Sequence, residues 1–123
     1  MKIIIAGAGE VGRHLAKMLS SENQDIVLMD NDENRIKDLD GNYDLLTKVG
    51  SPTSIKDLEE AGVAEADLFI AVTPEESINM TACMLANNLG AHKTLARIDN
   101  SEYSQPKNKD FFEDDKRAPD FVL

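Results

Sequence analysis

Short apolar runs alternate with helical patterns along almost the whole chain, and this alternation limits the chain to a small group of folds. The apolar runs, each predicted to be a strand, cover residues 3–6, 26–29, 43–49, 68–72 and 94–98, and a sixth begins at 121. The helical patterns run over 10–20, from Asn31 or Asp32 to 40, from Thr53 or Ser54 to 61, over 75–89 and over 106–112. The runs at 3–6, 26–29 and 68–72 are apolar throughout, which is typical of strands buried on both faces, whereas 43–49 is more polar and is expected near a sheet edge. The sequence therefore predicts an α/β protein with a three-layer, doubly wound parallel sheet of about six strands.

Two of the predicted helices indicate how they pack. In the helix at 10–20, the apolar residues Val11, Leu15, Met18 and Leu19 recur at helical spacing, so we expect this face to lie against the sheet. The helix at 75–89 is apolar over more than half of its circumference, and its Cys83 is expected to be a small core residue.

Length and charge exclude several classes of protein. The chain has 123 residues and a net charge of −10, from 23 Asp and Glu against 13 Lys and Arg. This length predicts one domain and is too short for a complete two-domain dehydrogenase. The acidity is a poor match for nucleic acid or an anionic membrane surface, and no apolar run approaches the roughly 20 residues of a membrane span. A single cysteine also excludes an intrachain disulfide and a cysteine-based metal site.

A glycine motif follows the first predicted strand and begins the first predicted helix. Residues 7–12 read Gly-Ala-Gly-Glu-Val-Gly, the G-x-G-x-x-G pattern of the Rossmann dinucleotide-binding loop. In that pattern Gly7 allows the tight turn, Gly9 leaves room for a pyrophosphate, and Gly12 lets the helix pack closely on the strand. The free amides and positive dipole end of the helix then bind the phosphates. A glycine-rich turn without a ligand is the alternative.

An acidic residue stands where the same fingerprint requires one. Asp30 ends the second predicted strand, 18 residues after Gly12, and is predicted to accept hydrogen bonds from an adenosine ribose. Its charge repels a 2′-phosphate, which favours NAD(H) or ATP-type ligands over NADP. The alternative role is helix capping, although Asn31 and Asp32 are available for that.

Further candidates follow other strands, where ligand crevices form. Gly50 and Ser51 come after the third strand, and Thr73 and Pro74 come after the fourth. Arg97 is a charged residue inside a run that otherwise indicates a buried strand, so it requires a partner. A ligand phosphate is one partner, and an ion pair with Asp99 or Asp67 is the other.

No catalytic constellation is visible in the sequence. His14 and His92 are not spaced with a carboxylate as an acid–base pair or a metal-ligand set. No P-loop motif is present, which disfavours a P-loop hydrolase. We therefore predict a protein that binds, with no catalytic residue, no metal site and no enzyme activity.

Several segments are more particular than the glycine loop. They are residues 2–12 and 25–30, Ala66-Asp67-Leu68-Phe69-Ile70-Ala71-Val72-Thr73, Asn79-Met80, Leu95-Ala96-Arg97-Ile98 and Glu102-Tyr103. With these segments the chain, from Met1 to about Phe112, resembles the N-lobe of the regulator-of-potassium-conductance (RCK) family, also called the KTN or TrkA-N domain. The resemblance implies a Rossmann lobe that binds NAD(H), or in some members ATP, ADP or AMP. It also implies homo-oligomers, dimers or larger, that gate a membrane potassium-translocating subunit of the TrkH type from the cytoplasmic side.

By matching positions, the resemblance assigns roles to individual residues. Gly7, Ala8, Gly9, Glu10 and Val11 would contact the pyrophosphate, Asp30 with its neighbour Asn31 the adenosine ribose, Thr73 and Pro74 the adenine or ribose side, and Arg97 a phosphate. Many relatives have G-D-x-T after the third strand, where this chain has Gly50-Ser51-Pro52-Thr53, so the contact there is in question. Family proteins also continue into a second lobe, so we expect the chain to be a fragment or a standalone lobe.

Two other hypotheses stay open from the sequence. The chain could be the nucleotide-binding half of an oxidoreductase, which would need a substrate pocket and an acid–base residue from elsewhere. It could also be a dimerisation domain that binds no nucleotide, in which case Gly9 and Arg97 would have no evident reason.

Overall fold

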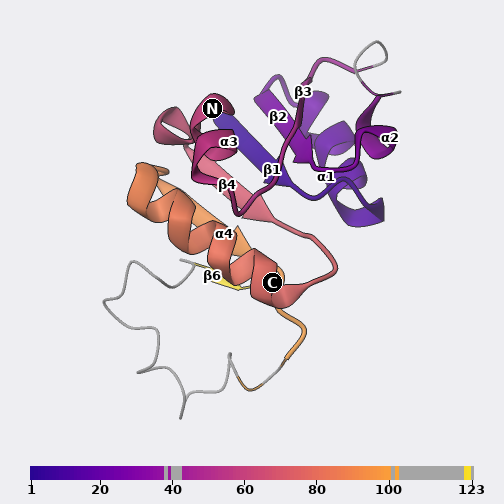
Figure 1. Cartoon of the computed structure of the whole chain (residues 1–123). Coiled ribbons are helices and arrows are strands. Elements are labelled where there is room, and N and C mark those ends of the chain that lie inside the picture. Colours follow the sequence, from indigo (N-terminus) through magenta and orange to yellow (C-terminus); the bar gives the residue numbers. More distant parts are fainter. Residues whose placement is uncertain (38, 40–42, 101, 103–120, 123) are drawn as a thin grey trace.

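The computed structural model describes residues 1–37, 39, 43–100, 102 and 121–122. All strands are parallel and form one sheet in the order β3-β2-β1-β4-β5-β6 (Figure 1). The strands are β1 (Lys2–Ala6), β2 (Asp25–Asp30), β3 (Leu46–Val49), β4 (Leu68–Ala71), β5 (Lys93–Ala96) and β6 (Phe121–Val122). The helices are α1 (Glu10–Ser20), α2 (Glu33–Ile36), α3 (Ile55–Glu60), the short 3-10 helix η1 (Val63–Glu65) and α4 (Glu76–Leu89). The predicted α/β fold with a doubly wound sheet of six strands is confirmed.

The sheet buries both of its faces. Successive residues of β1 point to opposite sides, so Ile4 packs with α3, η1 and α4, whereas Ile3 and Ile5 pack with α1 and α2. Figure 1 shows α3 and α4 on one side of the strands and α1 and α2 on the other. The central strands are apolar throughout because each is covered on both sides.

The predicted packing face of α1 is partly wrong. Val11 and Met18 are 40% and 47% exposed, whereas the fully covered positions of α1 are Gly12 and Ala16. These two small residues, one turn apart, let the helix approach the strands closely. Leu15 is half-buried beside them, and the larger apolar residues therefore lie at the margins of the contact.

Three predicted element bounds also differ from those in the structure. The third strand begins at Leu46, not at 43, because Leu46 pairs with Val27 and a strand from 43 would extend past the first residue of β2. The fifth strand ends at Ala96, opposite Ala71, the last residue of β4, so Arg97 lies beyond it. The helix predicted to reach residue 40 covers only Glu33–Ile36, with Asp32 as its N-cap and Lys37 as its C-cap.

The two ends of the sheet agree with the predictions as far as the structure describes them. β3 is an edge strand, and its Lys48 ammonium donates to the Glu60 carboxylate of α3 (2.6 Å), which raises the pKa of Lys48. At the other edge β6 pairs with β5 through Leu95 and Phe121. The predicted helix at 106–112 lies outside the described residues.

Candidate nucleotide-binding site

A crevice opens at the carboxyl edge of the sheet, where the strand order reverses between β1 and β4. In doubly wound folds this switch point is where ligands bind. The crevice has a volume of about 250 Å³ and is lined by Gly7, Asp30, Asn31, Arg35, Ser51, Pro52, Thr53, Thr73, Pro74, Glu75 and Ile78. Six of the residues predicted for the site are in that set: Gly7, Asp30, Asn31, Ser51, Thr73 and Pro74. They come from four loops that are far apart in the sequence.

Two close main-chain contacts shape the glycine loop. Gly7 has a φ of +112°, and a Cβ there would stand 2.9 Å from the Thr73 nitrogen, so the loop lies directly against the end of β4. A Cβ on Gly12 would collide with the Gly7 carbonyl group. These two positions thus accept only glycine, as the fingerprint predicts.

Gly9 differs from the other two glycines. Among the described residues, no atom lies within 4 Å of the place where its Cβ would stand. Gly9 is the N-cap of α1 and supplies no side chain to the first amides, and the first main-chain bond there runs from the Arg13 N–H to the Gly9 carbonyl (3.0 Å). The first amides of a helix point out of its end, so this terminus offers donors and a positive dipole to an anion.

Asp30 is a buried carboxylate that supports the glycine loop. It is 4% exposed; one oxygen accepts from the Ala8 N–H (2.8 Å) and the other from the Asp32 N–H (2.8 Å). Each carboxylate oxygen has two lone-pair directions, so acceptor capacity remains toward the crevice. Asp30 therefore has a structural role in the loop and also lines the crevice.

The structure adds Arg35 to the site. Its guanidinium lies 3.5 Å from an Asp30 oxygen and 3.6 Å from an Asp32 oxygen, and its side chain is 48% exposed. In the sequence it stands one turn into the helix after Asp30, where an arginine can reach a phosphate but is more often a solvated surface residue. The described structure places it at the crevice, where it partly offsets the charge of both carboxylates.

An acidic residue of α3 binds the loop after β3, although the sequence did not single it out. Asp57 of α3 accepts from the Ser51 N–H (2.9 Å), and its side chain lies against Gly50. Ser51 also shares a hydrogen bond with the Thr53 hydroxyl (3.0 Å). Asp57 thus fixes the loop after β3 from the neighbouring helix.

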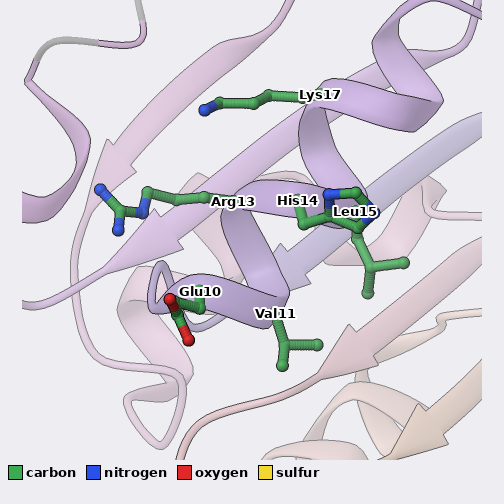
Figure 2. A pocket seen from close by; sticks show the side chains of 6 residues that line it. All are labelled: Glu10, Val11, Arg13, His14, Leu15 and Lys17. Carbon is green, nitrogen blue, oxygen red and sulfur yellow. The ribbon is translucent and has the colours of Figure 1, made fainter.

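The other seven predicted residues are not in that lining set: Ala8, Gly9, Glu10, Val11, Gly12, Gly50 and Arg97. Glu10 and Val11 line a separate hollow of about 590 Å³ on the outer side of α1, with Arg13, His14, Leu15 and Lys17. Figure 2 shows Arg13 and Lys17 extending to one side of this helix and Val11 and Leu15 to the other. Ala8 is completely buried and contributes its amide to Asp30.

Arg97 is not the buried strand residue that the sequence predicts. It follows β5, its side chain is 37% exposed, and its guanidinium pairs with Asp99 at 3.5 Å. The ion-pair alternative is therefore the arrangement in the structure, and a phosphate contact of Arg97 stays a prediction.

The described residues offer binding groups and few reactive ones. They contain no cluster of three or more His, Cys, Asp or Glu that could hold a metal ion. His14 and His92 are exposed, and Cys83 is buried in the core. Within the described part of the chain, no helix has the length and apolar character needed to cross a bilayer.

Fold and crevice together define an α/β domain of the Rossmann type, and comparisons identify its family. Residues 3–113 match the TrkA-N domain family, so the chain belongs to that family. Over 112 residues, 90% of this chain, it is 49% identical to the Trk system potassium uptake protein TrkA of Haemophilus influenzae. The match covers 24% of that relative, so the chain spans about a quarter of its length.

Solved structures share the fold at low sequence identity. The TrkA-N domain of the inner membrane protein ybaL from Escherichia coli has a TM-score of 0.81 at 16% identity, over 99% of this chain and 85% of that one. The GsuK channel bound to NAD has a TM-score of 0.79 at 20% identity, over 99% of this chain and 21% of that one.

The glycine geometry predicts that two substitutions differ in their effect on stability. Gly12→Ala is expected to lower the free energy of unfolding by about 2 kcal/mol or more, since the added methyl collides with the Gly7 carbonyl. Gly9→Asn, at the open N-cap, should stay within about 0.5 kcal/mol of the original chain, because asparagine caps a helix as well as glycine does. Urea denaturation followed by circular dichroism measures both. Equal losses in the two variants would contradict the assigned packing of the loop.

Proposed function

We propose that the chain is a nucleotide-sensing regulatory domain of a potassium uptake system, and that NAD(H) is its ligand. The observation that carries the proposal is the crevice at the switch point, with the open Gly9 and the buried Asp30 on either side of the same loop. The α1 terminus would bind the pyrophosphate and Asp30 the adenosine ribose. The other predicted residues would complete the contacts: Ala8, Glu10 and Val11 at the pyrophosphate, Asn31, Thr73 and Pro74 at the adenosine, and Arg97 at a phosphate. ATP, ADP or AMP are the alternative ligands, since Asp30 suits the ribose of each.

The charges of the crevice favour NAD(H) over NADP(H). Asp30 and Glu75 line the crevice and Asp32 adjoins it, against the single guanidinium of Arg35. A 2′-phosphate would therefore approach a region of net negative charge. The pyrophosphate would instead meet neutral amides and a helix dipole, which bind an anion without a positively charged side chain.

Regulation requires a partner that responds to the ligand. The similar protein from Haemophilus influenzae is a potassium uptake protein, which supports a role of this domain in potassium transport. We propose a homo-oligomer that acts on a membrane potassium-translocating subunit of the TrkH type from the cytoplasm, as the N-lobe of a longer protein. A nucleotide would shift that assembly only through different affinities for its conformations. The domain would perform no chemistry itself.

A titration series tests the ligand assignment. We expect NAD⁺ or NADH to bind with a dissociation constant below about 1 mM, and NADP⁺ to bind at least about tenfold more weakly because of the carboxylates. Isothermal titration calorimetry with NAD⁺, NADH, NADP⁺, ATP and ADP measures these affinities. If none of the five bound below millimolar concentration, the sensing function would be wrong.

A charge placed at the N-cap tests the phosphate position. Gly9→Asp should weaken NADH binding by about tenfold or more, because its carboxylate would face the pyrophosphate at the α1 terminus. Gly9→Asn has nearly the same size without the charge and should bind more tightly than Gly9→Asp. Fluorescence titration with NADH compares the two. If both variants bound NADH as tightly as the original chain, no phosphate would lie at this helix end.

A further inference from the structure

Asn79 is one of the few polar side chains that the structure buries completely. It lies on the second turn of α4 and is 1% exposed. A buried primary amide is costly unless its polar atoms are paired. All of its hydrogen-bonding positions are occupied, and its partners, Thr73 and Arg97, lie just after the carboxyl ends of β4 and β5.

Three of these bonds hold the loop after β4. The Asn79 Oδ1 accepts from the Thr73 N–H (2.9 Å) and from the Thr73 hydroxyl (2.7 Å), and its Nδ2 donates to the Thr73 carbonyl (3.0 Å). Both main-chain polar groups of Thr73 are thus bound to one side chain. A main-chain amide must donate and a carbonyl must accept, so these partners also fix the orientation of the Asn79 amide.

The remaining bond reaches the next strand. The Asn79 Nδ2 also donates to the Arg97 carbonyl (2.8 Å), directly after β5. On the preceding turn of α4, the Glu76 carboxylate accepts from the Asp99 N–H (2.9 Å) and the Asn100 N–H (2.8 Å). The start of α4 therefore holds the segments that leave both β4 and β5.

The Thr73 peptide is also the surface on which the glycine loop lies. A Cβ on Gly7 would be 2.9 Å from the Thr73 nitrogen and 3.0 Å from the Val72 carbonyl carbon. A shift of Thr73 toward the loop would therefore displace Gly7, which lies on the opposite side of the switch point. From this network we infer that Asn79 is a positioning residue of the nucleotide crevice, setting the Thr73 peptide against the glycine loop and the Arg97 backbone beside it.

This inference rests on the proposed nucleotide binding, and Asn79→Asp tests it. The substitution keeps the shape and the acceptor for Thr73, but it turns an oxygen toward the Thr73 and Arg97 carbonyls in place of the donor. We expect the dissociation constant of NADH to rise about tenfold, in line with a lost buried hydrogen bond. The measurement is fluorescence titration of the chain at a temperature where circular dichroism finds each variant fully folded.

Two controls separate positioning from general destabilisation. Asn88→Asp adds the same charge on the exposed side of α4, where Asn88 donates to the Met84 carbonyl (2.9 Å). Phe69→Leu lowers stability in the core of β4 and removes none of the hydrogen bonds of Asn79. Both should bind NADH within about twofold of the original chain, because a folded protein with an intact crevice keeps its affinity. If the NADH affinity of Asn79→Asp also stayed within twofold, the positioning role would be wrong, while the proposed nucleotide binding would stand. If the original chain did not bind NADH, the proposed function itself would fail.

If Asn79→Asp does not fold, hydrogen exchange of the original chain tests the inference instead. Saturation with NADH should slow hydrogen exchange of the Thr73 and Arg97 amides, because the ligand needs both segments in place. Asn79→Ser, which adds no charge, should lose that slowing. Unchanged exchange at both amides in the original chain would overturn the inference.

Discussion

The Asp30 carboxylate joins the glycine loop to the end of β2, and the crevice depends on that contact. One oxygen holds the Ala8 amide and the other holds the Asp32 amide, so a single buried side chain connects the turn after β1 with the start of α2. Charged hydrogen bonds of this kind are short and strong, and they offset the cost of burying the charge. With Ala8 held, Gly7 keeps its left-handed conformation and α1 begins at the correct place. The residue predicted to bind the ligand is therefore also the residue that shapes its pocket.

The acidity of the chain makes the local arrangement of charge important. A net charge of −10 opposes an anionic ligand in general, yet the groups at Gly9 and the α1 terminus are neutral amides aligned with a helix dipole. Arg35 lies within 3.6 Å of both Asp30 and Asp32 and partly offsets their charge in the crevice. In the proposed complex, charged residues would determine which nucleotide fits, whereas main-chain groups would supply the affinity for phosphate.

The sequence predicted the fold well because strand–helix alternation and parallel pairing are repeated signals. Each apolar run corresponds to a strand, and Gly7 and Gly12 make the close approaches that the fingerprint predicts. Details that depend on a neighbour were missed: the length of the third strand depends on where β2 begins, and that of the fifth on where β4 ends. The packing face of α1 was misjudged because close approach selects small residues, not the most apolar ones. Arg35 and Asp57 were also not distinguishable in the sequence, since their roles arise only when separate loops meet.

Asn79 has the same kind of role on the other half of the sheet. Asp30 and Asn79 are two of the three buried polar residues in the described part of the chain, and the third, Thr94, lies within β5. Asp30 connects the loops of β1 and β2, and Asn79 connects those of β4 and β5. The close approach of Gly7 to Thr73 joins the two halves. A ligand at the switch point would therefore contact two loop pairs, each held by one buried side chain, and a change in either would alter the crevice without disturbing the apolar core.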